Sequence, residues 1–199
     1  MDAAIRGHHL AINVVVAGPN IAFTPSLTGS QPAIYTREGK DVRPLGREND
    51  KAFNLINALN AEQRQKATLT YEINDLVLGP GQAGRTLPPE GLSASEMTPE
   101  QQAMLLDLIG EWVGMLNQDD AVPKLAQIRS EINQSYFAWY GDTTNPSAVY
   151  YRITGPTLHI EFAHQGGRSG QGVQAGGVNH IHTIYRDPTN DYGKRFTGK

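Results

Sequence analysis

The hydrophobic pattern of the C-terminal third has a period of two residues, which is the spacing of a β-strand. Apolar and polar positions alternate, or β-branched and aromatic residues gather, in four segments: 136–140, 148–153, 157–163 and 179–186. Turn residues separate them at 141–146, at 155–156 and along the Gly-rich stretch 165–177. Consecutive strands joined by turns predict an antiparallel meander, with 165–177 as a flexible hairpin loop.

The middle of the chain has helical spacing instead. Phe53, Ile56 and Leu59 fall on one face of a predicted helix. Asn60 followed by Gln63 has the pattern of a capping box, which predicts a break at Asn60 and a second short helix after it. The segment from 68 to 97 is rich in Gly and Pro and is predicted to be a long loop, a kind of segment that is usually functional or mobile.

The clearest helix is predicted at 99–116. Thr98 is its expected N-cap, Pro99 suits its first position, and Gln101 completes a capping box. A broad apolar stripe along this helix predicts packing against the meander, and a helix at 122–132 is expected to pair with it as an αα-hairpin. The stripe consists of Met104, Leu105, Leu108, Ile109, Trp112, Val113 and Leu116.

The N-terminal region predicts a hairpin, with a β-branched strand at 10–16, a turn at 17–20 and a short apolar run at 21–23. The following segment, up to residue 46, lacks periodicity and is expected to be an irregular surface excursion. Together the patterns predict an α+β fold, in which the C-terminal meander and the N-terminal strands form an antiparallel sheet against a central group of helices. The 199 residues are expected to form one domain.

Composition narrows the classes of function. The net charge is −3, and Lys and Arg are scattered, so a nucleic-acid partner is not expected. No apolar run approaches the length of a membrane span, and residues 1–6 lack the apolar core of a secretory signal. The sequence therefore predicts a soluble protein, cytoplasmic as given, with the periplasm left open. Because cysteine is absent, any metal site must use His, Asp or Glu.

His180 and His182 are the sharpest candidates for chemistry. Residues two apart in a strand project to the same face, so both imidazoles can converge on one metal ion. On the preceding strand, His159 and Glu161 share the face opposite to Leu158, Ile160 and Phe162. If the two polar faces match, His159 and Glu161 stand opposite or diagonal to the histidine pair, whereas a slip of one residue separates them. The alternative is that these are ordinary polar residues on a hydrated sheet face.

Two further groups carry candidate residues. His8 and His9 precede the first predicted strand, and at most one of them is expected to join a shared site, because adjacent strand residues point to opposite faces. We predict that this pair meets His180 and His182, since the N-terminal strand needs a partner and the end of the meander offers an open edge. Arg186 and Asp187 either present a charge to an anion and to a metal or imidazole, or fix a structural turn.

The blocks Gly7-His8-His9-Leu10 and His180-Ile-His-Thr-Ile-Tyr-Arg-Asp-Pro-Thr-Asn-Asp-Tyr-Gly193 resemble a bacterial family known as domain of unknown function 3500. The segments 106–110, 136–139 and 155–162 resemble it as well, so the likeness covers most of the chain. Members that we associate with these motifs are longer on the N-terminal side. The chain is therefore expected to be a short member or a C-terminal fragment of a longer architecture. The resemblance implies no reaction.

The leading hypothesis is a protein that binds a divalent metal, zinc or copper, and acts as a metal-dependent hydrolase on a small or polymeric organic substrate. His180 and His182 are the proposed ligands, completed by His8, His9, His159 or Glu161, with Arg186 and Asp187 as further catalytic candidates. The alternatives are a non-catalytic metal carrier with a closed ligand shell and a structural domain whose histidines only form hydrogen bonds. The pattern leaves a homo-oligomer open.

Overall fold

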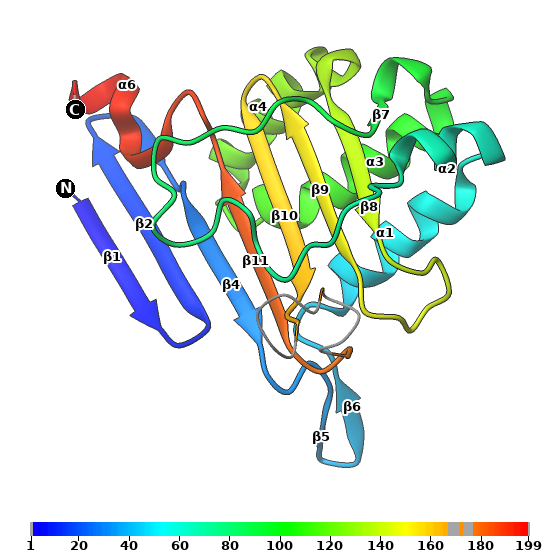
Figure 1. Cartoon of the computed structure of the whole chain (residues 1–199). Helices are drawn as coiled ribbons and strands as arrows, with labels where there is room; N and C mark the ends of the chain where they lie inside the picture. Colours follow the sequence, from blue (N-terminus) through cyan, green and yellow to red (C-terminus); the bar gives the residue numbers. More distant parts are fainter. Residues whose placement is uncertain (1, 167–171, 173–176, 199) are drawn as a thin grey trace.

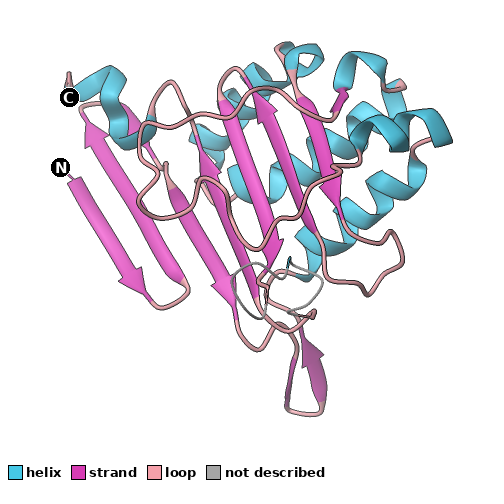
Figure 2. Cartoon of the chain, viewed as in Figure 1, coloured by secondary structure: helices cyan, strands magenta, loops and turns pink. Residues whose placement is uncertain are grey.

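The computed structural model describes residues 2–166, 172 and 177–198, and its centre is one nine-stranded antiparallel sheet (Figure 1). The strands lie in the order β1-β2-β4-β11-β10-β9-β8-β7, and β3 pairs with β2. Helices α1 to α4 cover one face, and the long loop between α2 and β7 crosses the other (Figure 2). The predicted α+β class is confirmed. Strand bounds are β1 (Asp2–Gly7), β2 (Leu10–Ala17), β3 (Asn20–Ala22), β4 (Ser26–Ser30), β7 (Leu92–Ser93), β8 (Tyr136–Tyr140), β9 (Tyr150–Gly155), β10 (Leu158–His164) and β11 (Ile181–Arg186), with a separate hairpin of β5 (Tyr35–Arg37) and β6 (Lys40–Val42).

The C-terminal meander is confirmed, because β8, β9, β10 and β11 are neighbours in chain order and pair antiparallel. Every residue of β10 is buried. Helices lie over one of its faces and the loop over the other, so its polar residues face protein rather than water. Most of the predicted Gly-rich hairpin loop at 165–177 lies outside the described residues.

The helices are α1 (Gly46–Ala58), α2 (Ala61–Ala67), α3 (Pro99–Val113), α4 (Gln118–Ser130) and the short α6 (Lys194–Thr197). Both predicted capping boxes are present, at Asn60 with Gln63 and at Thr98 with Gln101. Three boundaries differ from the prediction. Helix α3 ends at Val113 rather than at 116, with Gly114 as its C-cap. Helix α4 begins at 118 rather than 122, because the Asn117 side chain caps it, and it ends at 130 rather than 132. Within the described residues, no helix has the length and apolarity needed to span a bilayer.

The α3 stripe packs on the sheet as predicted. Leu105, Leu108 and Ile109 are fully buried, and the Trp112 ring meets Tyr151 of β9 edge-on, with 6.4 Å between ring centroids. The Trp112 indole N–H donates to the Thr183 hydroxyl of β11 at 3.1 Å. This contact ties the helix layer to the strand that carries the candidate histidines.

The expectation for residues 24–46 was wrong. This segment contains β4, which lies between β2 and β11 and pairs with both. Strand β2 therefore reaches the meander through β4 rather than by joining its edge. The sequence Ser-Leu-Thr-Gly-Ser shows no apolar alternation, and cross-strand pairing holds it, including a 2.9 Å hydrogen bond between the Thr28 and Thr183 hydroxyls. The sequence also gave no sign of β1, an edge strand whose side chains from 3 to 7 are exposed.

Candidate metal centre

Three histidines from opposite ends of the chain converge at one end of the sheet. His9, His180 and His182 each offer a ring nitrogen, and these nitrogens all lie within 4.8 Å of one another. The Nε2 atoms of His9 and His180 are 2.9 Å apart. Two imidazoles bound to one tetrahedral zinc ion have nitrogens about 3.3 Å apart, so a small movement suits the cluster to a metal. All three rings are partly exposed.

The sheet brings His9 and His182 together across Gly29. The Gly29 N–H donates to the His9 carbonyl at 2.9 Å, and Gly29 is the β4 partner of His182. A Cβ at position 29 would lie 3.0 Å from Cδ2 of His9 and 3.2 Å from Cδ2 of His182. The absence of a side chain at this position is therefore what gives the two rings their space.

His180 lies just before β11, and backbone hydrogen bonds on both sides hold it. The carbonyl of Asn179 accepts from the Ala33 N–H at 2.9 Å, and the carbonyl of His180 accepts from the Gln165 N–H at 2.9 Å. Its ring centroid is 4.6 Å from that of His182. The prediction that both imidazoles project from one strand holds only for His182, because β11 begins at Ile181, but the two rings lie close enough to share a ligand, as expected.

Asp75, from the loop that crosses the sheet, contacts the cluster on the Nδ1 side of the His182 ring. Its two carboxylate oxygens each lie 2.9 Å from Nδ1 of His182. The carboxylate fixes the tautomer with the proton on Nδ1, which leaves the Nε2 lone pair of His182 free. A carboxylate behind a histidine is the usual outer partner of a metal-binding imidazole.

The electrostatics of the cluster favour neutral imidazoles at His9 and His180. Burial lowers the pKa of His9, and the neighbouring His8 and His182 lower it further. Burial also lowers the pKa of His180, together with His182 and His9, against the opposite effect of Asp75. Burial raises the pKa of Asp75, but its hydrogen bonds with His182 and the Leu76 N–H outweigh that effect and leave the pKa lowered. The lowered pKa values of His9 and His180 favour the neutral ring, which is the form that binds a metal.

His8 is exposed in the turn between β1 and β2, and it is not one of the three converging residues. Its ring centroid lies 4.4 Å from that of His9. The two histidines of the N-terminal pair therefore occupy different positions, one in the cluster and one on its solvent side.

The polar faces of β10 and β11 match as predicted for Glu161, but His159 lies opposite Arg186, so the prediction that it stands opposite or diagonal to the histidine pair was wrong. His182 pairs with Ala163, so Glu161 is diagonal to His182 on the same face. Glu161 is nevertheless fully engaged elsewhere. It accepts hydrogen bonds from the N–H groups of Val77 and Leu78 and from the Tyr150 hydroxyl, and it contacts Nε2 of His159 at 2.8 Å.

These contacts make Glu161 and His159 a buried pair that fastens the crossing loop to the sheet. Burial raises the pKa of Glu161, but His159 and the other donors outweigh that effect and lower it. In the described residues neither side chain contacts the three-histidine cluster.

The charged groups of Arg186 and Asp187 are held by the turn and its surroundings. The Arg186 Nε donates to Asp191 at 2.8 Å, and Asp187 forms an ion pair with Lys124 at 2.7 Å. Asp187 also accepts from the backbone N–H and the hydroxyl of Thr189. These contacts favour the interpretation that Asp187 fixes a structural turn. Arg186 differs, because its side chain also lines two pockets.

His164, at the end of β10, provides a test of burial. Its pKa is lowered to about 4 because burial disfavours the charged ring, against a backbone hydrogen bond with Val149. An unfolded histidine titrates near pH 6.5, so between that pH and about 4 only the unfolded chain holds this proton. The folded state therefore has its full stability with respect to His164 above pH 6.5 and loses stability as the pH falls below that value.

The free energy of unfolding of the metal-free protein should decrease between pH 7 and pH 5, and we expect this decrease to be about 2 kcal/mol smaller in the His164→Gln variant. Urea titrations at both pH values measure it, and equal decreases in both proteins would contradict this account.

A comparison with protein-family models matches residues 2–194 to a family described as "Protein of unknown function (DUF3500)". The chain belongs to this family. No curated protein and no solved structure matches the chain. The family description carries no activity, so the chemistry of the centre rests on its geometry.

Sequence reasoning missed Asp75 and Gly29. Asp75 lies 107 positions from His182 in a loop without periodicity, and only its place within a loop of unusual length marked it. Gly29 lies in a strand that the hydrophobic pattern does not reveal. Gly29 meets the cluster through strand pairing and Asp75 through a contact between the loop and the sheet, and a single sequence displays neither.

Proposed function

We propose that the protein binds a divalent metal, zinc in the first place, through Nε2 of His9, His180 and His182, with Asp75 orienting His182. The observation that carries the proposal is the convergence of three ring nitrogens within 4.8 Å, one of them backed by a carboxylate. Zinc, copper and nickel all accept imidazole ligands. Three protein ligands with water in the remaining position are typical of a catalytic zinc site, which activates that water for hydrolysis.

The proposed reaction is metal-assisted hydrolysis of an organic substrate. The three rings are partly exposed, so a substrate can approach the metal from the solvent side. Asp75 holds the tautomer of His182 and adds negative charge behind it, which strengthens that ligand.

One observation favours a second candidate function, a non-catalytic metal carrier. His8 lies beside His9, with 4.4 Å between ring centroids, and a turn of its side chain would bring a fourth imidazole to the metal. Four protein ligands close the shell and are typical of structural or storage sites.

Cobalt substitution distinguishes the two functions. The metal-free protein is loaded with Co²⁺, and acetohydroxamate is added while the visible absorption of the ion is recorded. A three-histidine site with an open position predicts a new spectrum on addition of the chelating group, and the His8→Ala variant should behave in the same way. An unchanged wild-type spectrum that becomes responsive only in His8→Ala would establish the closed shell. Failure of the protein to bind Co²⁺ or Zn²⁺ at all would refute both.

The space at Gly29 gives a second test of the centre. A methyl group at this position would also lie 2.7 Å from the Ile181 carbonyl, so the backbone and both rings must shift. We expect Gly29→Ala to weaken zinc binding about tenfold or more, measured by competition with a chromophoric chelator. Gly7→Ala is the matched control, because its added Cβ meets only Leu10 at 3.9 Å. Equal zinc affinity in both variants would contradict the proposed geometry.

A further inference from the structure

Two pockets lie side by side on the face of the sheet that the crossing loop covers. The larger has a volume of about 540 Å³, and the smaller of about 220 Å³. They share four lining residues, so they form one trough, and the larger alone falls in the size range of small-molecule sites. The shared residues are Asn13, Ala83, Arg186 and Tyr192.

The trough begins next to the candidate metal centre. Ala11, Leu27 and Ile184 line the smaller pocket, and each lies two positions along its strand from a residue of the cluster row, His9, Gly29 and His182 respectively. Residues two apart share a face, so the apolar floor of the smaller pocket starts one row from the histidines. Arg186 lies four positions beyond His182 on the same strand, about 13 Å away.

Arg186 is the buried polar group at the junction of the two pockets. It is only 4% exposed, its Nε donates to Asp191, and its Nη1 donates to the Gln82 carbonyl at 3.2 Å. Its Nη2 forms no hydrogen bond with any described residue. A guanidinium with one unused amino group beside a cavity is suited to receive an anionic oxygen.

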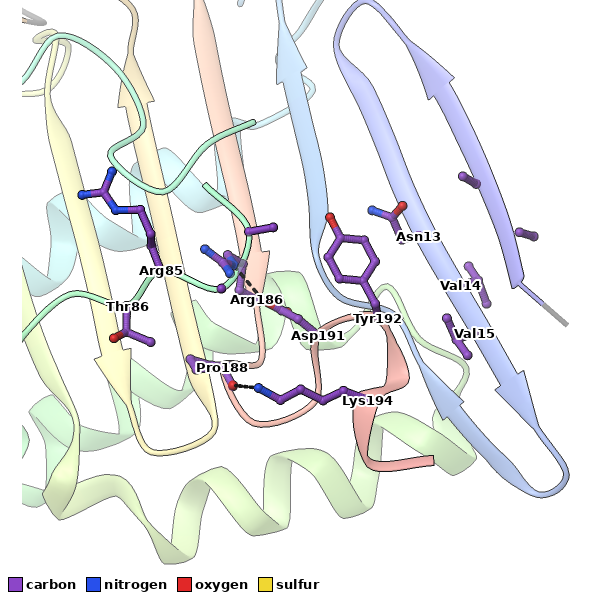
Figure 3. A pocket seen from close by; sticks show the side chains of 14 residues that line it. Asn13, Val14, Val15, Arg85, Thr86, Arg186, Pro188, Asp191, Tyr192 and Lys194 are labelled. Carbon is purple, nitrogen blue, oxygen red and sulfur yellow. Dashed lines mark hydrogen bonds and ion pairs between the residues drawn. The ribbon is translucent and has the colours of Figure 1, made fainter. Parts of the chain in front are cut away.

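Tyr192 supplies a second polar group at this junction. It is 48% exposed and holds a left-handed backbone conformation with φ 57°, which its N–H stabilises by donating to the Thr24 carbonyl at 2.7 Å. Figure 3 shows its ring beside Asn13, between the β2 side chains and Arg186. Its hydroxyl has no hydrogen-bond partner in the described part of the chain.

The charge of the trough is positive although the protein is acidic overall. Arg6, Arg85, Arg186 and Lys194 line its walls, and among the described lining residues the only carboxylate is Asp191. Because Asp191 is paired with Arg186, the other three cations have no carboxylate partner among the described residues. The remaining lining is largely small and aliphatic, which includes Ala4, Val14, Val15 and Pro188.

We infer that the trough binds an elongated organic anion with an apolar body, whose carboxylate or phosphate contacts Nη2 of Arg186 and the Tyr192 hydroxyl. The apolar body lies on the aliphatic floor. A molecule that also fills the smaller pocket places its far end at the three histidines. That such a ligand is also the substrate rests on the proposed function.

Octanoate and its neutral analogue octanamide test the trough in the metal-free protein by isothermal titration calorimetry. The wild-type protein should bind octanoate about ten times more tightly than octanamide, since only the carboxylate pairs with Arg186. Tyr192→Phe should reduce octanoate binding without changing octanamide binding. Arg186→Gln should abolish the preference between the two. The preference is a ratio, so partial unfolding of this variant does not affect it.

A blocking variant locates the ligand independently of the buried arginine. Ala83 is exposed on the loop and lines both pockets, so Ala83→Trp should fill the trough and reduce octanoate affinity about tenfold or more. Ala126→Trp, at an exposed position of α4, is the matched control and should bind octanoate as the wild type does. Absence of any preference for octanoate, or unchanged binding in Ala83→Trp, would overturn the inference.

The monohydroxamate of suberic acid, with a carboxylate at one end and a metal-chelating group at the other, tests the link to the metal. It should bind the zinc-loaded protein at least about tenfold more tightly than the metal-free protein, whereas octanoate should bind both alike. If octanoate binding follows the pattern above but zinc does not bind, the trough is an anion site and the proposed function is wrong. If zinc binds but octanoate does not, the inference about the trough is wrong and the metal site is retained. Equal hydroxamate affinity with and without bound zinc would refute the connection between them.

Discussion

Replacing His182 by alanine is expected to reduce zinc affinity by a factor of about 100 or more, because one of three ligands and its carboxylate partner are lost together. His9→Ala should have an effect of the same size. The double variant should lose little more than either single variant, since residues of one site act as a unit. Equilibrium dialysis with elemental analysis measures all three proteins after purification without a histidine tag.

Two comparisons make this result specific. Asp75→Asn keeps the shape of the side chain but weakens its hold on His182, so zinc affinity should fall by about 10- to 100-fold, less than for a lost ligand. His164→Gln removes a histidine of the same sheet outside the cluster and should retain full zinc affinity. Full metal content in either His9→Ala or His182→Ala would remove that residue from the site.

Removal of the Glu161 side chain is expected to lower the free energy of unfolding more than any other variant proposed above. Glu161→Ala leaves the N–H groups of Val77 and Leu78 and the Tyr150 hydroxyl without their acceptor, and it leaves His159 without its partner. Breaking a buried pair from one side costs about 3–5 kcal/mol, which urea unfolding of the metal-free protein measures.

The same variant separates a structural role from the catalytic or ligand role that the sequence suggested for Glu161. If Glu161 only fastens the loop, the folded variant should lose no more zinc affinity than Asp75→Asn does, because displacement of the loop removes at most Asp75 and all three histidines remain. Replacing His159 by leucine as well should recover part of the stability, since the unpaired imidazole is removed. A loss of zinc affinity as large as that of His182→Ala, in a protein that is still folded, would restore Glu161 as a ligand.

The parts of the fold predicted correctly are those in which local pattern and tertiary packing agree. The α3 stripe and the four strands from 136 onward repeat with the period of the element that they form. The two capping boxes mark the starts of α2 and α3 through local hydrogen bonds. Strand β4 was missed because two neighbouring strands, rather than an apolar face, hold Ser26–Ser30 in place. Strand β1 lies at the sheet edge with exposed side chains, so its sequence shows no alternation of apolar and polar residues that would predict a strand.

The candidate centre was predictable in its histidines and not in its surroundings. The spacing of His180 and His182 predicted that the two residues lie together. Because β2 needs a pairing partner, His9 was also predicted to lie near them, and it does, although β4 rather than β2 pairs with β11. Strand parity placed Glu161 on the correct face. It could not show that N–H groups of the crossing loop would donate to the Glu161 carboxylate, nor that the Asp75 carboxylate would contact Nδ1 of His182.

X-ray absorption spectroscopy of the zinc-loaded protein tests the central claim most directly, because it reports the atoms bound to the metal. The account predicts one zinc per chain with three imidazole nitrogens at about 2.0–2.1 Å and an oxygen in the remaining position. The imidazole scattering should decrease in His9→Ala, His180→Ala and His182→Ala and stay unchanged in His159→Gln. A metal shell without imidazole nitrogens, or a shell identical in the wild type and the three alanine variants, would contradict it.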